Sequence, residues 1–442
     1  MTPSAWAAEV DALVRRLRPP APRQVGTLVR MVGLTLEARG LHAPLGALCR
    51  VSSPEGASVD AEVVGFNDGV LFLMPFTEPR GIGPGARVAL TSRVPSAALG
   101  DALLGRVIDG LGQPLDGLPV PLCEDRLGLR GLPLNPMERG PIEAPFDVGV
   151  RAINGLLTLG RGQRMGLVAG SGVGKSVLMG MLTKGSEADV VVIGLIGERG
   201  REVREFVQQT LGPEGLARAV VIAAPADQSP VLRLKATQLT HLVAEYFRDQ
   251  GKNVLMLVDS LTRVAHAQRE VGLAIGEPPT AKGYPPSVFA LLPALIERAG
   301  VGRGGHGAIT AFYTVLAEGD DATDPIVDIA RASLDGQVML SRALADAAHY
   351  PAIDMAGSIS RVMPQLVPPD RLQRANQVRR LWTLYQQNQD LIAVGAYEAG
   401  SDPELDRAIA KREELAHFLQ QPMDTQASLA EAEVALDAIV KE

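Results

Sequence analysis

Residues Met165–Met181 read MGLVAGSGVGKSVLMGM, an apolar strand that runs into a glycine-rich turn and then into a helix. This order predicts a phosphate-binding loop, because closely spaced glycines let successive backbone N–H groups and a helix N-terminus point at one anion. Lys175 adds a positive charge for the β- and γ-phosphates, and Ser176 adds a hydroxyl for Mg²⁺. A glycine-rich turn with an incidental Lys-Ser pair is the alternative, which the flanking strand and helix disfavour. The expected nucleotide-binding residues are Gly170, Ser171, Gly172, Val173, Gly174, Lys175, Ser176 and Val177.

The composition predicts two or three globular domains, since the 442 residues are 46% hydrophobic and 4% aromatic. No apolar run reaches the ~20 residues that a membrane span needs, and the N-terminus lacks the order of a secretory signal. The two cysteines, Cys49 and Cys123, lie far apart, which indicates a reducing compartment and no disulfide framework. The net charge of −7 disfavours a general nucleic-acid binder and leaves only a local basic groove open. The six histidines show no metal-ligand spacing.

The first segment, residues 4–18, predicts a short amphipathic helix, in which Trp6, Val10, Leu13, Val14 and Leu17 recur at helical spacing. Prolines at positions 19, 20 and 22 end it and detach it from the next domain. Two roles stay open for this helix: contact with a partner or a membrane surface, or plain packing on the next domain.

Residues 25–90 change to short β-rich runs separated by turn signals, which predicts a small closed β-barrel that caps or assembles the particle. Asn67-Asp-Gly lies between two apolar runs and is the clearest hairpin signal in the chain. The expected strands are Gly26–Leu36, Ala47–Val51, Ala61–Phe66, Val70–Met74 and Ala86–Leu90.

The central region, roughly residues 146–365, alternates strands and helices as a parallel nucleotide-binding sheet does. Val190–Ile196 is a continuous apolar run, typical of a strand buried on both faces. It leads into Glu198, whose carboxylate would stand where a water is oriented for attack on the γ-phosphate. A solvated loop charge is the alternative for Glu198. The further expected strands are Ala219–Ala223, Ala308–Val315 and Gln337–Leu340, with a connecting segment before the domain at Leu104–Gly117.

A second acidic residue follows the apolar strand Asn253–Val258. Asp259 at its tip matches a Walker B acid that holds the Mg²⁺ water shell, while a helix-capping aspartate is the alternative. Arg263, one helical turn later, would reach the γ-phosphate or stabilise the loop. Gly276–Pro286 is too rich in proline for regular structure and predicts a moving or pore-facing loop.

Residues 366–442 are helical by pattern. Asp402-Pro403 predicts an N-cap followed by proline at the first helical position. Apolar residues then recur at helical spacing in two stripes, which we interpret as bundle-core positions: Leu405, Ile409, Leu415 and Leu419, then Leu429, Ala432, Leu436 and Ile439.

Taken together, these motifs resemble the catalytic subunits of rotary-type ATPases, whose signature decamer matches PAIDMAGSIS at Pro351–Ser360. Within that superfamily the chain is most similar to flagellum-specific export ATPases over about residues 23–420, through AGSGVGKSVLMGM, GLIGERGREVREF, DSLTRVAHAQRE, AIGEPPTAKGYPPSVFALLPALIERAG and ITAFYTVLAEGDDATDPI. The paralogous ATPases of virulence injectisomes share most of these blocks. GFNDGVLFLMPFTEP and DLIAVGAYEAGSDPELDRAI favour the flagellar branch.

The resemblance implies an α/β fold with a RecA-like P-loop core, an N-terminal small β-barrel and a C-terminal helical domain. The corresponding boundaries are 1–22 for the helix and linker, 23–95 for the barrel, 96–365 for the ATPase domain and 366–442 for the helical domain. It also implies the roles of single residues. Lys175, Glu198, Arg199, Arg263 and Arg361 are expected to be catalytic, Ser176 and Asp259 to hold Mg²⁺, Tyr350 to stack on adenine, and Tyr397 to be a second adenine-side aromatic.

The implied function is Mg²⁺-ATP hydrolysis by a homohexamer that energises export of flagellar subunits from the cytoplasm. The implied partners are a stator-like regulator at the N-terminal helix, a central-stalk-like protein, the export gate and export chaperones, with peripheral association at the inner membrane of the flagellar base and no nucleic acid. Four alternatives stay open: an injectisome ATPase, a rotary ATP synthase subunit in a mixed ring, an RNA-translocating helicase, and a structural subunit that binds nucleotide without hydrolysis. The helicase would need a basic run that residues 25–90 lack, and the structural subunit would lack the acid at Glu198.

Overall fold

The structure is a computed structural model that describes residues 6, 24–131, 133–170, 172–316 and 324–441. The chain divides into two compact units, Met1–Val94 and Pro95–Glu442. The helix expected over residues 4–18, with the partner or membrane role expected for it, lies outside the described residues except at Trp6. Across the described ranges, no helix has both the length and the apolar character that crossing a bilayer requires.

The first unit is a closed six-stranded barrel, as the sequence predicts, with strand order β1-β2-β5-β4-β3-β6. Its strands alternate between the barrel interior and solvent: in β3, Cys49 and Val51 are buried while Arg50 between them is exposed. The six strands are β1 (Val25–Val32), β2 (Thr35–Arg39), β3 (Leu48–Ser52), β4 (Ser58–Asn67), β5 (Val70–Pro75) and β6 (Arg87–Ser92).

Two turns of the barrel show how local sequence sets its register. Asp68 (φ 48°) and Gly69 (φ 73°) both have positive φ, so the predicted hairpin between β4 and β5 is a two-residue turn of the type that matches strand twist. The single strand expected over Gly26–Leu36 is wrong. Gly33 (φ 54°) turns the chain after Val32, because glycine adopts left-handed φ without steric cost, and β2 begins at Thr35.

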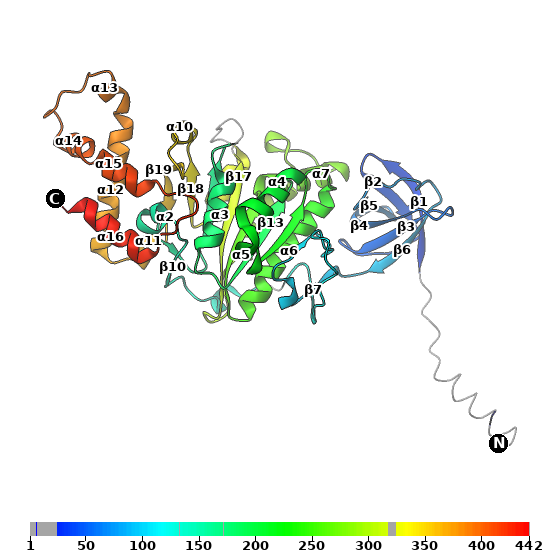
Figure 1. Cartoon of the computed structure of the whole chain (residues 1–442). Helices are drawn as coiled ribbons and strands as arrows, with labels where there is room; N and C mark the ends of the chain where they lie inside the picture. Colours follow the sequence, from blue (N-terminus) through cyan, green and yellow to red (C-terminus); the bar gives the residue numbers. More distant parts are fainter. Residues whose placement is uncertain (1–5, 7–23, 132, 171, 317–323, 442) are drawn as a thin grey trace. The chain divides into compact units, whose positions relative to one another are not determined.

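The second unit is built on a nine-stranded sheet of order β19-β18-β12-β17-β15-β13-β14-β8, with β16 paired to β17. Figure 1 labels β13, β17, β18 and β19 of this sheet. Strands β8, β14, β13, β15, β17, β12 and β18 run parallel to their neighbours, so their carboxyl ends meet at one edge. The strands are β8 (Val107–Ile108), β12 (Arg164–Ala169), β13 (Val190–Ile196), β14 (Ala219–Ala224), β15 (Asn253–Asp259), β16 (Gly300–Val301), β17 (Ala308–Leu316), β18 (Gly336–Leu340) and β19 (Ile353–Ser360).

Both ends of this sheet differ from the expectation. The connecting segment at Leu104–Gly117 contributes β8, which pairs in parallel with β14. No strand is expected from the sequence over Pro351–Ser360, but this segment contains β19, which pairs antiparallel with β18. Neither strand carries the long apolar run that marks a buried strand: β8 has two residues, and β19 lies at the edge with alternating burial.

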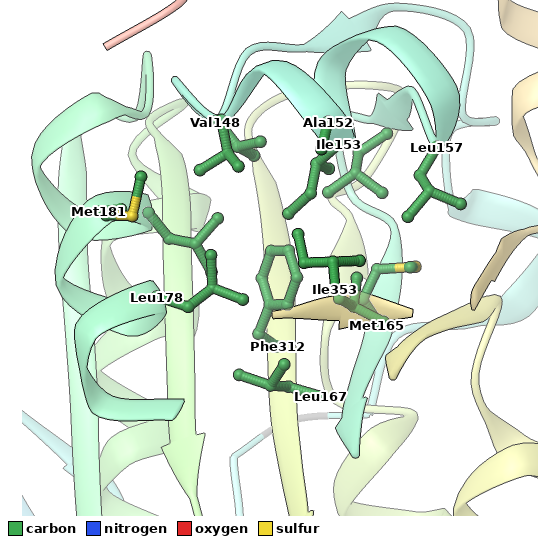
Figure 2. Packing of buried hydrophobic residues seen from close by; sticks show 14 of the residues in the cluster. Val148, Ala152, Ile153, Leu157, Met165, Leu167, Leu178, Met181, Phe312 and Ile353 are labelled. Atoms are coloured by element: carbon green, nitrogen blue, oxygen red, sulfur yellow. The ribbon is translucent and has the colours of Figure 1, made fainter. Parts of the chain in front are cut away.

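Helices cover both faces of the sheet. On one face α3 packs with Phe312 of β17 and Leu167 of β12, as Figure 2 shows, and on the other face α6, α7 and α8 form a second core. The helices of this region are α2 (Arg151–Leu156), α3 (Lys175–Gly185), α4 (Gly200–Glu205), the π-helix η3 (Phe206–Leu211), α5 (Gly212–Ala217), α6 (Pro230–Asp249), α7 (Leu261–Ala274), α8 (Pro286–Ile296), α9 (Pro325–Ser333), α10 (Arg342–Asp346) and α11 (Met363–Leu366).

Within the proline-rich segment Gly276–Pro286, regular structure is limited to the short 3-10 turn η4 (Ala281–Gly283) and the first residue of α8. Tyr284 after this turn is buried, its ring stacks on His266, and the Arg269 guanidinium lies 4.9 Å from its ring centroid. The remaining short elements are β7 (Ser96–Leu99), η1 (Asp101–Leu103), β9 (Asp125–Gly128), η2 (Pro136–Glu138), β10 (Pro145–Phe146) and β11 (Leu159–Gly160).

The C-terminal helices share one hydrophobic core with the α3 face of the sheet, through residues such as Leu415, Phe418 and Leu436. Asp402 accepts hydrogen bonds from the backbone N–H groups of Glu404 and Leu405, which confirms the predicted N-cap. The helices are α12 (Pro369–Gln387), α13 (Gln389–Ala393), α14 (Pro403–Ala410), α15 (Arg412–Leu419) and α16 (Leu429–Val440).

Candidate nucleotide hydrolysis site

The glycine-rich loop joins the end of β12 to the start of α3, at the carboxyl edge of the sheet. Gly172 (φ 76°) and Gly174 (φ 93°) are left-handed, a conformation that costs a side-chain-bearing residue strain, and Gly174 is the N-cap of α3. The N-terminus of α3 therefore opens onto the loop, as an anion site requires. Ser171 lies outside the described residues.

Lys175 is the centre of a three-residue charged cluster. Its Nζ lies 2.5 Å from Asp259 Oδ1 and 3.3 Å from Glu198 Oε1. The three side chains are only 12%, 5% and 17% exposed for Lys175, Asp259 and Glu198. Burial by itself lowers the pKa of Lys175, but the charges of Asp259 and Glu198 and their hydrogen bonds outweigh burial and raise it. The lysine is therefore held charged at the loop.

Topology explains why residues far apart in the chain meet here. Asp259 ends β15 and Glu198 follows β13, and these strands are parallel neighbours, with Leu195 level with Asp259. Lys175 begins the helix that follows β12, on the same edge of the sheet. The structure thus brings together three of the residues that the sequence singled out.

Thr314 is a site residue that sequence reasoning missed. Its hydroxyl donates to Asp259 Oδ1 across 2.5 Å, from the adjacent strand β17. The side chain is buried, with 1% of the residue exposed. A signal was present in the sequence, since Thr314 is a polar residue near the end of the otherwise largely apolar strand AITAFYTVL.

The arginines expected at the site differ in their positions. Arg263 lies beside the residue before Glu198, because a Cβ added at Gly197 would stand 2.7 Å from Arg263 Cβ. Arg199 is 77% exposed and pairs with Glu202 at 3.5 Å. The structure therefore places Arg263 against the Glu198 loop, whereas the Arg199 side chain points into solvent.

A pocket of about 820 Å³ lies beside the loop and is lined by Gly174, Val177 and Tyr350, with Gln421 and Pro422 from the C-terminal region. The Tyr350 residue is 46% exposed, and its Cε1 would stand 3.5 Å from a Cβ added at Gly174. An exposed ring and apolar walls next to a phosphate loop suit a purine base.

Tyr397 is not among the residues that line this pocket. Its hydroxyl oxygen lies 2.9 Å from Asp406 Oδ1 and 3.1 Å from the carbonyl oxygen of Asp402, and shares its one proton with them, so the side chain contacts the start of α14. The pocket is completed instead by residues 420–427 after α15. The helical periodicity of the sequence did not indicate that these residues line the pocket.

Arg361 directly follows β19 and is exposed. Its guanidinium donates to the carbonyls of Leu334 and Arg331, each at 3.3 Å. Within the described part of the chain, no carboxylate pairs with it.

Strand register places Arg361 away from its own phosphate loop. Ser360 pairs with Gly336, and Gln337 pairs with Gly166 near the start of β12. Gly336 is therefore level with Met165, and the four residue steps from Met165 to Ala169, where the loop begins, span roughly 13 Å of β12 at about 3.3 Å per residue. Arg361 thus lies near the amino ends of the parallel strands, whereas Lys175 lies at their carboxyl ends.

The residues at the loop fit a magnesium ion bound together with a nucleotide. Asp259 offers a carboxylate and the exposed Ser176 a hydroxyl, which are the hard oxygen ligands that Mg²⁺ prefers. Among the described residues there is no group of three or more His, Cys, Asp or Glu side chains that could hold a metal alone.

Two known families match this chain, each over a different part of the second unit. Residues 149–360 match the nucleotide-binding domain of the ATP synthase alpha/beta family. Residues 367–438 match the T3SS EscN ATPase C-terminal domain. The first range contains the phosphate loop, Glu198 and Asp259, and the second contains helices α12 to α15 and most of α16.

Individual relatives extend the similarity over nearly the whole chain. The flagellum-specific ATP synthase of Pseudomonas aeruginosa is 56% identical over 441 residues, covering 99% of this chain and 98% of the relative. The type 3 secretion system ATPase of Xanthomonas euvesicatoria is 50% identical, covering 91% of each chain. The solved structure of the assembled ATPase EscN from the type III secretion system of enteropathogenic E. coli superposes with a TM-score of 0.87 at 42% identity, covering 94% of this chain and 100% of that one. The chain therefore belongs to the ATP synthase alpha/beta family, in the group of flagellum-specific ATP synthases and type III secretion ATPases.

Proposed function

We propose that this chain hydrolyses ATP with Mg²⁺ and that hydrolysis energises export of flagellar subunits through the flagellar type III apparatus. The observation that carries the proposal is the meeting of Lys175, Glu198 and Asp259 beside the glycine-rich loop. A phosphate loop by itself only binds nucleotide. A carboxylate such as Glu198, held within 3.3 Å of the loop lysine, adds a group that orients or deprotonates the attacking water.

The roles of the residues follow from their positions. The N–H groups of the loop and the Lys175 ammonium bind the phosphates, and the buried site strengthens these contacts. Glu198 would act on the water, and Arg263, which packs against the preceding Gly197, would meet charge on the γ-phosphate. Ser176 and Asp259 would hold Mg²⁺, which neutralises charge on the phosphate oxygens when it is bound. Tyr350 provides the stacking surface for adenine.

The position and exposure of Arg361 support a function of this chain in an assembly. The residue is exposed, unpaired with carboxylates within the described chain, and on the edge of the sheet opposite to its own loop. Such a guanidinium suits a neighbouring subunit's ATP, where it would stabilise charge that develops in the transition state. We propose a homohexameric ring, in line with the structural similarity to the assembled EscN.

Partners and location are proposed by similarity. A structure of EscN in complex with its central stalk EscO has a TM-score of 0.86 to this chain, so we propose a stalk-like partner here as well. A stator-like regulator, the export gate, export chaperones and a cytoplasmic position at the flagellar base complete the proposal. The higher identity to a flagellum-specific relative than to the Xanthomonas secretion ATPase, 56% against 50%, favours flagellar over injectisome service.

The test combines purified protein with the native cell. Phosphate release from ATP should require Mg²⁺, should not depend on RNA, and should occur with rings of this chain alone. In the native cell, Glu198→Gln should abolish flagellar subunits in the medium. Loss of injectisome effectors with normal flagellar export would overturn the flagellar assignment. RNA-stimulated turnover or a requirement for a second ring subunit would overturn the ATPase class that we propose.

A further inference from the structure

We infer that Thr314 is a positioning residue that fixes the Asp259 carboxylate for Mg²⁺ independently of Lys175. The inference rests on the Mg²⁺-ATP hydrolysis proposed above and adds a residue to it. Its basis is the direct contact between Thr314 Oγ1 and Asp259 Oδ1 at 2.5 Å, in a place where Thr314 is 1% exposed and the Asp259 side chain is 5% exposed.

The strand geometry explains why this hydroxyl reaches the site. Val258 of β15 pairs with Tyr313 of β17, so Asp259 and Thr314, one residue further along each strand, are neighbours. Side chains two residues apart on a strand point to the same face. Phe312 points to the face that α3 covers, where it packs near Leu178 (Figure 2), so Thr314 faces the helix that Lys175 begins.

Asp259 Oδ1 accepts two side-chain hydrogen bonds, one from Lys175 and one from Thr314. The other carboxylate oxygen, Oδ2, takes part in neither of them. A carboxylate held through one oxygen presents the second in a defined direction, which suits contact with the water shell of Mg²⁺.

The two donors differ in how firmly they hold the carboxylate. Lys175 has a flexible four-carbon stem, and its ammonium also contacts Glu198 and must serve the phosphates of the substrate. Thr314 is β-branched, with few rotamers, and sits on a central strand between β12 and β15. When the lysine turns toward phosphate, the threonine hydroxyl still holds Asp259.

The experiment measures the affinity of a fluorescent ATP analogue by anisotropy, in EDTA and at increasing Mg²⁺. Thr314→Val removes the hydroxyl and keeps the shape, whereas Thr314→Ser keeps the hydroxyl. Thr314→Val should bind the analogue in EDTA like the unmodified chain, but should need ~10-fold more Mg²⁺ for half-maximal tightening, because a hydrogen bond to a charged group is lost. Thr314→Ser should restore the Mg²⁺ response.

Thr310→Val is the matched control. Thr310 is also buried on β17, but its hydroxyl accepts from the Gly162 N–H and does not contact Asp259. This variant should keep the normal Mg²⁺ response. If Thr314→Val does not fold, Thr314→Ala against Thr314→Ser makes the same comparison, since these two differ only in the hydroxyl.

Three outcomes would overturn the inference: an unchanged Mg²⁺ response in Thr314→Val, an equal loss of affinity in EDTA and in Mg²⁺, or a Thr314→Ser variant that responds like Thr314→Val. Failure of the proposed function is distinguishable, because it would appear in the unmodified chain as analogue binding without any dependence on Mg²⁺.

Discussion

The backbone N–H of Gln421 donates to the carbonyl oxygen of Tyr350 across 3.0 Å. The C-terminal region is thereby joined to the residue expected to stack on adenine. The buried Gln421 side chain extends the junction, since Nε2 donates to the carbonyls of Gly149 and Thr425 and Oε1 accepts from the Arg151 N–H. The pocket beside the phosphate loop therefore depends on the docking of the C-terminal helices.

Gln421→Glu should weaken that junction and raise the KM for ATP more than it lowers kcat. The new oxygen would face the carbonyls of Gly149 and Thr425, and each unsatisfied buried group costs about 1–3 kcal/mol. We expect a KM increase of roughly tenfold together with a lower midpoint of thermal unfolding. Gln389→Glu, on an exposed residue that does not line the pocket, is the stability control. An unchanged KM in a destabilised Gln421→Glu protein would reduce this residue to a structural role.

Lys175→Ala and Glu198→Gln should separate binding from chemistry. The lysine makes ground-state contacts with phosphate, so its removal should weaken ATP binding. Glu198→Gln should bind ATP but lose ~10²–10⁴-fold in turnover, because a positioned base is absent. Equilibrium binding and single-turnover phosphate release measure the two effects. Near-normal turnover in Glu198→Gln would remove this residue from its proposed role.

Arg361→Ala subunits should bind ATP and turn it over ~10³–10⁵-fold more slowly, the range of arginine fingers in other nucleotide hydrolases. Specific activity of the unmodified chain should rise with protein concentration as rings form. Mixing Arg361→Ala with Lys175→Ala subunits should restore part of the activity, because some interfaces then pair an intact loop with an intact arginine. Arg303→Ala, on an arginine that is 73% exposed, is the control and should not change turnover.

A mixture that stays inactive while mixed rings demonstrably form would exclude action of Arg361 in a neighbouring subunit. Turnover per chain that is independent of concentration would lead to the same conclusion. Since Arg361 lies on the opposite edge of the sheet from its own loop, such a result would leave it no catalytic role.

His241 should make the second unit less stable in mild acid. Its Nδ1 lies 2.8 Å from the Thr237 carbonyl, which only accepts, so Nδ1 carries the proton and Nε2 accepts from the Tyr313 hydroxyl at 3.1 Å. Burial, with the charge of Arg298 in addition, lowers the pKa of His241 to about 3. The unfolded chain takes up a proton near pH 6.5 and the folded chain does not. This stabilisation is therefore complete above pH 6.5 and is lost as the pH falls from 6.5 toward 3.

Between pH 7.5 and pH 5, His241 should cost roughly 2 kcal/mol of unfolding free energy. Urea unfolding followed by tryptophan fluorescence, in which Trp382 is a buried reporter, measures the change. His241→Gln should flatten the pH dependence, whereas His306→Gln, on an exposed histidine, should leave it as it is. The same slope in His241→Gln and the unmodified chain would contradict the prediction.

Local residue chemistry and hydrophobic periodicity determine much of the secondary structure of this protein without tertiary contacts. The glycine spacing before Lys175, the apolar run Val190–Ile196 and the turn residues Asp68 and Gly69 each dictate their own backbone. For that reason the phosphate loop, the central strands and the barrel hairpin all form where the sequence places them. The sequence also predicted that Glu198 and Asp259 belong to the site, because each follows or ends a buried strand and parallel strands bring their carboxyl ends together.

Only the tertiary structure decided the features that depend on partners distant in the chain. Thr314 belongs to the site because its strand lies next to the one that ends in Asp259. Gln421 lines the pocket beside the phosphate loop and Tyr397 does not, because of how the C-terminal helices dock. Strand β19 is the outermost strand of the sheet, and some of its residues are exposed. Its sequence therefore lacks the continuous apolar run that would have predicted a buried strand. Sequence periodicity reports which face of an element is buried, whereas the identity of the neighbour is set by packing.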